Sequence, residues 1–439
     1  MKKVAFKEKL AYGAGDVGNN FLFQIGQLYL LKFYTDTLGL PAATAGLVFL
    51  VTKIWDGFVD VAVGAWIDGR KHIGRRGRFR PFMCYAAVPL AILTVVSVTA
   101  PEFSLTGKTV WAFGTYMAFG VAYSLFNIPY GSMIPAISQH PVERADLAAF
   151  RWTGSTTGLL LITVGFIPIV RAFEDVRTGY VAAGVVFALA GLLLQACCYA
   201  NVREHYAVRK PEKRQGKRAD NYRALLKNTP LIILCLANLF TFSAYNVKLA
   251  VQAFYCQYTL GDLSILPYMG FFSIGCIYIG VAVVPFFVRR FGKKAVFITG
   301  AAIWGAADLS AFLFVHDTLS FILFACAAFF GSSFINTLNW AFVSDAVEYG
   351  EWKTGIRAEG TVYSSFTFFR KISQAAAGFI PGVILALVGY VPNAVQTPEA
   401  IRGINGLMFV YPGVLALATF VLVGCAYRLS DRRFSEIVR

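Results

Sequence analysis

Twelve long apolar stretches run along this chain of 439 residues, and they constrain its fold more than any other feature. A helix needs about 20 mostly apolar residues to cross the hydrocarbon core of a bilayer. The stretches cover approximately residues 10–35, 44–67, 81–100, 109–137, 147–170, 179–201, 229–258, 266–288, 295–314, 319–346, 361–389 and 404–427. Only 15% of the residues are charged, against roughly 25% in a soluble domain. The sequence therefore predicts an all-α membrane protein with twelve transmembrane helices.

One long polar segment interrupts this pattern after the sixth stretch. It spans residues 202–228 and contains the basic run RKPEKRQGKR. We therefore expect two six-helix bundles, residues 1–201 and 229–439, joined by a basic cytoplasmic linker. A basic turn follows the second stretch (GRRGRFRP, 74–81), and another follows the eighth (RRFGKK, 289–294). Matching features in two halves are expected of transporters that are built from repeats.

The net charge of +16 is distributed as expected for a membrane protein. If both termini are cytoplasmic, the outer loops hold only four of the 40 Lys and Arg residues, and the spans hold six. The others then lie on the cytoplasmic side, as the positive-inside rule requires. Basic clusters such as RKHIGRRGRFR (70–80) would face anionic headgroups. We therefore expect a multi-pass protein of a bacterial inner membrane that contacts the lipid bilayer and binds no nucleic acid.

The eight cysteines all fall in apolar stretches, and no C-x-x-C pair occurs. This pattern favours buried thiols over a metal centre or a disulfide scaffold. The spans also contain no nucleophile–base pair and no metal cluster. The sequence therefore predicts that the protein is not an enzyme and needs no cofactor.

The second stretch carries three charged residues, Lys53, Asp56 and Asp60, in the segment KIWDGFVD. A charge at bilayer depth is costly and is functional by default. Spacings of three and four residues place all three on one face of a helix. Two carboxylates one turn apart suit a hard cation or a proton. We predict that Asp56 and Asp60 bind a co-transported Na⁺ or H⁺, and an ion pair between Lys53 and one aspartate is the structural alternative.

Polar residues in the first and fourth stretches are candidates for substrate contact. Asp16 lies among glycines in YGAGDVGNN, and a carboxylate there can accept hydrogen bonds from sugar hydroxyls. Asn127 lies in YSLFNIPYGSMIP, where we expect Pro129 and Pro135 to break backbone hydrogen bonds and free carbonyl oxygens for a cavity. An Asn can both donate and accept, which suits a polyol. We predict that Asp16, Tyr123 and Asn127 contact substrate hydroxyls; a charge partner for Asp16 and a satisfied Asn127 beside a kink are the alternatives.

Basic residues inside other stretches indicate the charge of the substrate. Arg151, Lys248 and the adjacent pair Arg370 and Lys371 lie in the fifth, seventh and eleventh stretches. Adjacent helical residues point about 100° apart, so Arg370 and Lys371 cannot share one role: we expect one of the two to line a cavity and the other to meet a neighbouring helix, and this pattern leaves open which is which. These bases would exceed the aspartates in a shared cavity and favour an anionic substrate, with Arg suited to a carboxylate or sulfonate. Pairing with aspartates is the alternative, and Asp308 stands isolated in the ninth stretch.

Several motifs together resemble a single family. They are YGAGDVGNN, FYTDTLGL, WDGFVD followed by GRRGRFRP, FNIPYGSMIPA with ERADL, and DAVEYGEWKTGIRAEG with FRKISQAAAG. They resemble the glycoside–pentoside–hexuronide:cation symporters, relatives of the melibiose permease in the major facilitator superfamily. The segments AYNVKLAVQ, NTLNWAF and EYGEWKTGIRAEG are most similar to sulfoquinovose-type permeases, with glucuronide permeases next.

The resemblance implies a major facilitator fold with a set of functional residues. It implies that Asp56 and Asp60 hold the coupling cation, that Asp16 and Arg151 contact the sugar, and that Lys371 lies near both sites. Melibiose-type members carry an aspartate where this chain has Asn127. The loss of that negative charge is consistent with an anionic sugar, and Lys248 is our own candidate for a partner of the anion.

The expected function is therefore secondary active transport by a monomer. We expect symport of an anionic sugar, sulfoquinovose or a related sulfo-sugar, with Na⁺ or H⁺ by alternating access. A glucuronide, hexuronide or neutral glycoside symporter and an exporter of a small organosulfonate remain open as alternatives. A channel or a sensory receptor is the alternative from another class.

Overall fold

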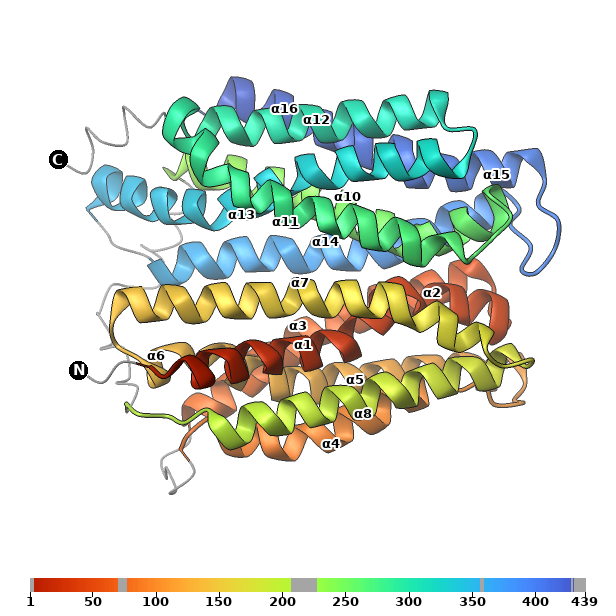
Figure 1. Cartoon of the computed structure of the whole chain (residues 1–439), viewed down its shortest axis with the longest axis horizontal. Helices are drawn as coiled ribbons and strands as arrows, with labels where there is room; N and C mark the ends of the chain where they lie inside the picture. Colours follow the sequence, from red (N-terminus) through yellow and green to blue (C-terminus); the bar gives the residue numbers. More distant parts are fainter. Residues whose placement is uncertain (1–3, 70–76, 207–226, 356–358, 428, 430–439) are drawn as a thin grey trace. The chain divides into compact units, whose positions relative to one another are not determined.

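The computed structural model describes residues 4–69, 77–206, 227–355, 359–427 and 429 (Figure 1). Within these ranges the regular structure is helical and contains no β-strand, which confirms the all-α prediction. Each predicted apolar stretch overlaps a helix. Eight helical segments in the described ranges are long and apolar enough to cross a membrane. The helices over residues 6–28, 42–69, 105–132 and 359–387 are not among these eight, and they carry most of the predicted site residues.

The chain divides into two compact units. The first comprises Met1–Pro211 and the short segment Tyr390–Ala394, and the second comprises Glu212–Gly389 and Val395–Arg439. In the short segment, Tyr390 donates a hydrogen bond to the carboxylate of Asp36, and Asn393 donates to the Asp36 carbonyl oxygen at 2.6 Å. Residues 207–226 of the predicted linker 202–228 lie outside the described residues.

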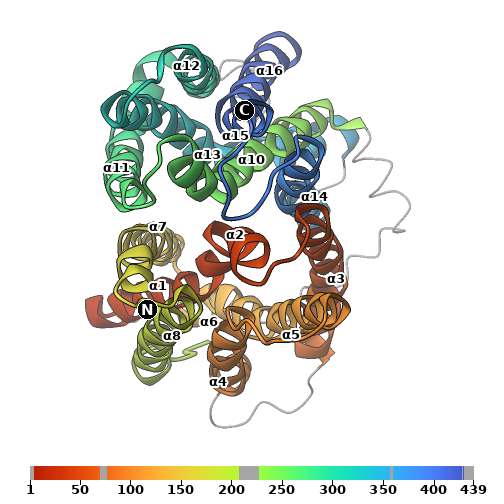
Figure 2. The ribbon, with the colours of Figure 1, turned by 90° about the vertical axis from the view of Figure 1, so that its right-hand side faces the viewer.

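The first unit is a bundle of helices in which α1 and α5 make the central contacts. Its elements are α1 (Phe6–Leu28), α2 (Leu30–Lys32), the π-helix η1 (Phe33–Thr37), α3 (Ala42–Gly69), α4 (Arg80–Ser97), α5 (Leu105–Ser132), α6 (Ile134–Ile137), α7 (Pro141–Arg171) and α8 (Val176–Asn201). Helix α1 packs against α7 and α8, as the view along the helices shows (Figure 2). Helix α5 packs against α3 and α4, and α4 also contacts α8.

The second unit repeats this contact scheme. Its described elements are α10 (Thr229–Phe254), the π-helix η2 (Tyr255–Thr259), α11 (Ile265–Phe291), α12 (Lys293–Phe314), α13 (Thr318–Thr354), α14 (Glu359–Leu387), α15 (Pro398–Asn405), the π-helix η3 (Gly406–Val410) and α16 (Tyr411–Ala426). Helix α10 packs against α14 and α16, α13 packs against α11 and α12, and α12 contacts α16. These pairs match those of the first unit in chain order, which is the pattern expected of an internal repeat.

A repeated turn at the end of the first helix of each unit supports this relationship. The first unit has FYTDTLG at residues 33–39, and the second has FYCQYTLG at residues 254–261. In each, a leucine N–H closes a π-turn, from Leu38 to Phe33 at 2.8 Å and from Leu260 to Tyr255 at 3.1 Å. Glycine follows in both cases with a φ near +79° or +78°, a conformation that glycine adopts without strain. Our reading of the sequence missed this repeat.

Glycines set the position of α1 against its neighbours. A Cβ on Gly13 would lie 2.8 Å from the carbonyl oxygen of Phe150 in α7, and a Cβ on Gly18 would lie 2.6 Å from that of Gly191 in α8. Only glycine allows such a close approach of two backbones. Because Asp16 lies between these two positions in α1, the tight packing fixes where its carboxylate points.

The start of α4 is held by a carboxylate from the end of the first unit. Glu204 accepts hydrogen bonds from the backbone N–H groups of Arg78, Phe79 and Arg80 at 2.7, 2.8 and 3.0 Å. The first N–H groups of a helix have no partner within the helix, and a negative charge at this end is favourable. Glu204 therefore caps α4 and ties it to the chain that leaves α8.

The two prolines near the end of α5 behave differently from each other. Pro129 lies inside α5, and the helix continues past it to Ser132, although proline has no N–H for the helical hydrogen-bond pattern. Pro135 lies in the first turn of α6, where its missing N–H costs nothing. The break therefore occurs at Met133, between the two helices.

Candidate substrate and cation sites

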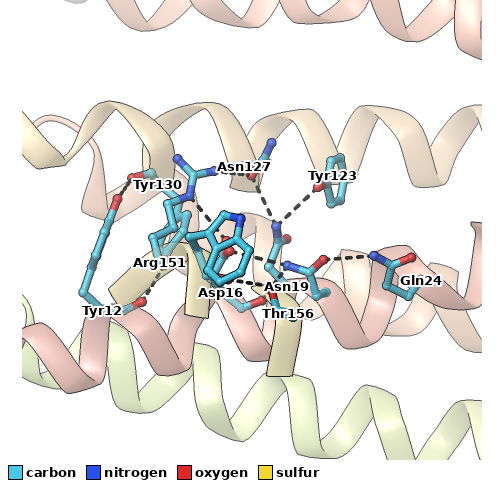
Figure 3. Close-up of polar contacts among 11 residues, drawn as sticks. Tyr12, Asp16, Asn19, Gln24, Tyr123, Asn127, Tyr130, Arg151 and Thr156 are labelled. Carbon is cyan, nitrogen blue, oxygen red and sulfur yellow. Dashed lines mark hydrogen bonds and ion pairs between the residues drawn. The ribbon is translucent and has the colours of Figure 1, made fainter. Parts of the chain in front are cut away.

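Asp16 and Arg151 form an ion pair inside the first unit (Figure 3). Asp16 lies on α1 and is buried, whereas the side chain of Arg151 on α7 is 31% exposed. The Nε of Arg151 lies 3.5 Å from Oδ1 of Asp16. This contact uses one N–H of the guanidinium and not the two parallel N–H groups of a bidentate pair. Asp16 therefore holds Arg151 in place through one N–H group, and the guanidinium does not offer two parallel N–H groups to that carboxylate.

Amide side chains connect this ion pair to α5. Oδ1 of Asn127 accepts hydrogen bonds from Arg151 at 3.4 Å and from Nδ2 of Asn19 at 3.2 Å, and Asn19 also donates to the Tyr123 hydroxyl at 3.4 Å. Oδ1 of Asn19 is buried without a hydrogen-bond partner among the described residues. Asp16, Tyr123, Asn127 and Arg151 thus come together with Asn19 as one polar cluster (Figure 3).

Two tyrosines form one wall of this cluster. Tyr12 and Tyr130 stack with ring centroids 4.7 Å apart, and each hydroxyl donates to the other residue's carbonyl oxygen. The guanidinium carbon of Arg151 lies 5.1 Å from the centre of the Tyr130 ring. This cation–π contact orients the arginine in addition to its ion pair.

The second polar cluster surrounds the carboxylates of α3. Oδ2 of Asp56 accepts from Lys53 at 3.1 Å, whereas its Oδ1 is buried without a hydrogen-bond partner among the described residues. Asp60 accepts a hydrogen bond from the Ser124 hydroxyl of α5. A buried carboxylate oxygen without a donor is costly, and a cation or a proton would satisfy it. The described residues contain no group of three or more His, Cys, Asp or Glu that could hold a metal ion, so hydroxyl or carbonyl oxygens would have to complete a sodium site.

Helix α5 forms a wall of both clusters. Gly120 and Ser124, four residues apart, face Asp56 and Asp60, which are also four residues apart on α3. Tyr123 and Asn127 have the same spacing and face Asn19 of α1. Residues four apart lie on one helical face, so α5 presents two neighbouring polar stripes. A movement of α5 would change both clusters together.

Lys248 is not a surplus cation in this structure. It forms an ion pair with Asp308 of α12, and their side chains are only 2% and 0% exposed. Nε1 of Trp304 donates to the second oxygen of Asp308 at 2.9 Å. Our expectation that Asp308 is isolated is therefore wrong, and so is the count that left Lys248 uncompensated. Asp308, which lies 60 residues further along the chain, supplies the negative charge that pairs with Lys248.

The adjacent basic residues of α14 differ in their surroundings. The guanidinium carbon of Arg370 lies 4.3 Å from the centre of the Phe242 ring and 5.7 Å from that of Trp340. Arg370 therefore packs against aromatic rings of α10 and α13, and we retain Lys371, which is half-buried, as the candidate for substrate contact.

Reading the sequence missed four residues that complete these clusters: Asn19, Gly120, Ser124 and Trp304. Asn19 had a usable signal, because it follows Asp16 by three residues and so lies on the same helical face. Gly120 and Ser124 sit in a helix rich in small and aromatic residues, and nothing in the local pattern singles them out.

Comparison with known proteins identifies the family. Residues 11–431 match the family model described as MFS/sugar transport protein. The chain belongs to this sugar-transport family of the major facilitator superfamily. The match spans both units, and the family resemblance inferred from the sequence is confirmed.

Relatives in this family are similar over nearly their whole length. The chain is 51% identical to a protein of Salmonella typhimurium strain LT2 named as a 2,3-dihydroxypropane-1-sulfonate exporter, covering 99% of this chain and 95% of the relative. It is 48% identical to a protein of Escherichia coli K12 named as a sulfoquinovose importer, covering 99% and 93%. It is 36% identical to the glucuronide carrier protein homolog of Escherichia coli K12, covering 100% and 95%.

Solved structures support the fold. A nucleoside transporter superposes with a TM-score of 0.68 at 14% identity over 94% of this chain and 99% of the other. A bacterial homolog of the human lysosomal transporter Spinster superposes with a TM-score of 0.67 at 14% identity over 98% and 97%. The family match and the named relatives, which are all transporters, make the protein a multi-pass membrane transporter of the major facilitator type and not an enzyme.

Proposed function

We propose that this member of the sugar-transport family is a cation-coupled symporter for an anionic sugar, with sulfoquinovose as the first candidate. The observation that carries the proposal is the contact between Arg151 and Asp16, in which one Nε–H meets the carboxylate at 3.5 Å while 31% of the arginine side chain stays exposed. An arginine held in this way can offer parallel N–H groups to a sulfonate or carboxylate.

The residues around Arg151 suit the rest of a sugar. The carboxylate of Asp16 accepts hydrogen bonds from hydroxyl groups, and the side chains of Asn127 and Tyr123 can both donate and accept. Asn19 brings a buried acceptor that has no partner among the described residues. Lys371 is the proposed second cation for the anionic group, because Lys248 is paired with Asp308 in the conformation described.

The names of the relatives support an anionic substrate. Sulfoquinovose and 2,3-dihydroxypropane-1-sulfonate share a sulfonate on a hydroxylated carbon chain, and a glucuronide carries a carboxylate. A site with an arginine beside hydroxyl-binding amides fits all three substrates. It fits a neutral galactoside less well, because nothing in such a ligand would use the guanidinium charge.

Coupling is proposed to arise at Asp56 and Asp60. A Na⁺ or H⁺ there would satisfy the bare Oδ1 of Asp56 and reduce the repulsion between the two carboxylates. Helix α5 contacts both this pair and Asn19. A cation that draws Ser124 and Gly120 towards α3 would therefore also set Tyr123 and Asn127, so that the sugar binds better when the cation is present.

A second candidate is an exporter of 2,3-dihydroxypropane-1-sulfonate. Two relatives with this name are 51% and 50% identical to the chain, slightly more than the two named as sulfoquinovose importers at 48% and 47%. The same site chemistry serves both substrates, because each offers a sulfonate and hydroxyl groups. The gradients of the cation and the solute decide the direction of net transport.

The proposed setting is a bacterial inner membrane, in which a monomer spans the bilayer twelve times with both termini in the cytoplasm. The excess of Lys and Arg in the loops that would be cytoplasmic supports this orientation.

Counterflow in proteoliposomes tests the proposal. Vesicles preloaded with sulfoquinovose, 2,3-dihydroxypropane-1-sulfonate, glucuronate or melibiose would be assayed for exchange, with sodium and pH varied independently. We expect exchange of at least one sulfonate and a response to one cation. Exchange of melibiose without exchange of any of the three acids would overturn the anionic assignment. Asp56→Asn should abolish gradient-driven accumulation, and full accumulation by that variant would remove Asp56 from coupling.

A further inference from the structure

The ion pair between Lys248 of α10 and Asp308 of α12 lies in the interior of the second unit. Both oxygens of Asp308 are used, one by Lys248 and the other by Nε1 of Trp304 at 2.9 Å. With side-chain exposures of 2% and 0%, the two charges depend on each other. Removing either side chain alone would leave the charge of the other buried and without a counter-ion in a medium of low dielectric constant.

Lys248 is incompletely satisfied by this partner. An ammonium group has three N–H donors, and Asp308 is the one hydrogen-bond acceptor that Nζ contacts in the described part of the chain. The other neighbours are aromatic rings, with Nζ 5.7 Å from the centre of Phe329 and 5.8 Å from that of Phe409. Cation–π contacts orient a charge but do not satisfy its N–H groups.

A second donor without a partner lies one turn further along α10. Gln252 follows Lys248 by four residues, is only 2% exposed, and its Nε2 has no hydrogen-bond partner within the described ranges. Buried polar groups are almost always hydrogen-bonded, so each exception needs an explanation. Lys248 and Gln252 lie on the same face of α10 and together offer more N–H groups than the protein accepts there.

The space beside Lys248 is a narrow crevice. It is lined by Tyr245, Lys248, Trp304, Ala328, Phe329 and Ser332, and its volume of about 140 Å³ includes space open to the outside. In this conformation it is too tight to hold a water molecule. A sulfonate is larger than a water molecule, so it could enter this crevice only after the side chains that line it move apart.

We infer that the carboxylate of Asp308 takes the place of the substrate's anionic group as the partner of Lys248 while no substrate is bound. Lys248 pairs with Asp308 while the site is empty and transfers to the sulfonate or carboxylate of the ligand when the crevice opens. Three oxygens of a sulfonate match the spare N–H groups of Lys248 and Gln252 better than the single oxygen of Asp308 does. This inference rests on the proposed transport of an anionic solute, and it makes Asp308 a determinant of affinity.

The distinction from a purely structural ion pair lies in the sign of the effect on binding. Asp308 competes with the ligand for Lys248, so its neutralisation should tighten binding of an anion. A structural pair predicts weaker or unchanged binding in every variant. Asp308→Asn keeps an acceptor for Trp304, while Lys248→Gln with Asp308→Asn removes both charges together and leaves none stranded.

The experiment measures binding of sulfoquinovose and of glucuronate to the purified full chain by calorimetry. In Asp308→Asn we expect about tenfold tighter binding and slower counterflow, because release becomes slow. In the double variant Lys248→Gln/Asp308→Asn we expect at least tenfold weaker binding than in the wild type. The control removes another ion pair of the same unit, Lys293→Gln/Asp345→Asn, and should bind as the wild type does.

Each outcome decides the matter. Wild-type affinity in a folded double variant would overturn the inference while leaving the proposed function intact. If Asp308→Asn does not fold, wild-type affinity in the double variant still overturns the inference, and Asp308→Ser, which removes the charge but keeps a hydroxyl acceptor for Trp304, replaces Asp308→Asn in the test for tighter binding. A wild-type protein that binds neither acid would overturn the proposed function itself, and the inference would fall with it.

Discussion

A methyl group on Gly120 of α5 would lie 1.9 Å from Oδ1 of Asp56 in α3. This carboxylate oxygen, which has no hydrogen-bond partner in the part of the chain that the structure describes, therefore occupies space that only a glycine leaves open. The packing of α5 against α3 thus decides where the bare oxygen of the proposed cation site lies.

Gly120→Ala should impair cation coupling because it pushes the Asp56 carboxylate away from its position. Overpacking of this kind costs about 1–3 kcal/mol, and if that cost falls on the cation-bound state, the cation affinity falls by roughly fivefold to a hundredfold. The measurement is the concentration of cation that half-activates uptake in proteoliposomes. Gly114→Ala on the same helix is the control, because a methyl group there would meet nothing within 4 Å. Equal activation in both variants would contradict the prediction.

Ser124→Ala should weaken the response to the cation by removing the hydroxyl that donates to Asp60. A hydrogen bond to a charged group contributes about 1.5–3 kcal/mol, so we expect roughly tenfold weaker activation. Ser124→Thr retains a hydroxyl and should remain close to the wild type. If the alanine variant needs no more cation than the threonine variant, Ser124 has no role in this site.

Arg151→Lys should lower the affinity for an anionic sugar although it conserves the positive charge. An ammonium cannot offer two parallel N–H groups to a sulfonate or carboxylate. We expect a loss of roughly tenfold or more in sulfoquinovose affinity, measured by counterflow. The control is Arg144→Lys in the same helix, where the guanidinium donates to the Ser138 carbonyl oxygen at 2.7 Å, outside the cluster. Unchanged affinity of the Arg151→Lys variant would show that binding depends on the positive charge at this position and not on two parallel N–H groups.

Glu204→Gln should destabilise the first unit without touching either polar cluster. The carboxylate caps three backbone N–H groups at the start of α4, and the loss of a helix cap costs about 0.5–2 kcal/mol. We expect a lower thermal midpoint in detergent. Glu174→Gln in the exposed loop between α7 and α8 should leave the midpoint unchanged. An equal midpoint in the two variants would argue against the cap.

Asp317 should make the stability of the second unit depend on pH in acid. The hydrogen bond from the Ser320 side chain, together with that from its backbone N–H, holds the pKa of the Asp317 carboxyl below its ordinary value of 3.8. Since the folded pKa is the lower one, the stabilisation is complete above 3.8 and disappears as the pH falls through the folded value.

Thermal midpoints of the wild type and Asp317→Ala, compared from about pH 6 to about pH 2, check this prediction. The wild type should be more stable by a constant amount until the pH approaches 3.8, and the difference should then shrink. A difference that persists unchanged at the lowest pH would mean that the cap does not depend on the charge of the carboxylate.

The amino-acid sequence by itself determined the all-helical architecture and the identity of most polar groups in the first unit. Long apolar stretches leave the backbone no alternative to helix in a bilayer. Spacings of three and four residues place Lys53, Asp56 and Asp60 on one face of α3, because that periodicity belongs to a single helix. The charged residues themselves stood out because charge is rare at bilayer depth.

Only the tertiary structure decided which of these groups meet. Lys248 and Asp308 lie 60 residues apart, and Ser124 and Asp60 lie 64 residues apart. Such pairs depend on the rotation and the axial shift of one helix against another, which the packing of many small contacts sets and no local pattern encodes. For that reason the sequence pattern predicted an unpaired positive charge at Lys248, whereas in the folded chain Asp308 neutralises it. The side chain of Arg151, by contrast, stays partly exposed beside Asp16.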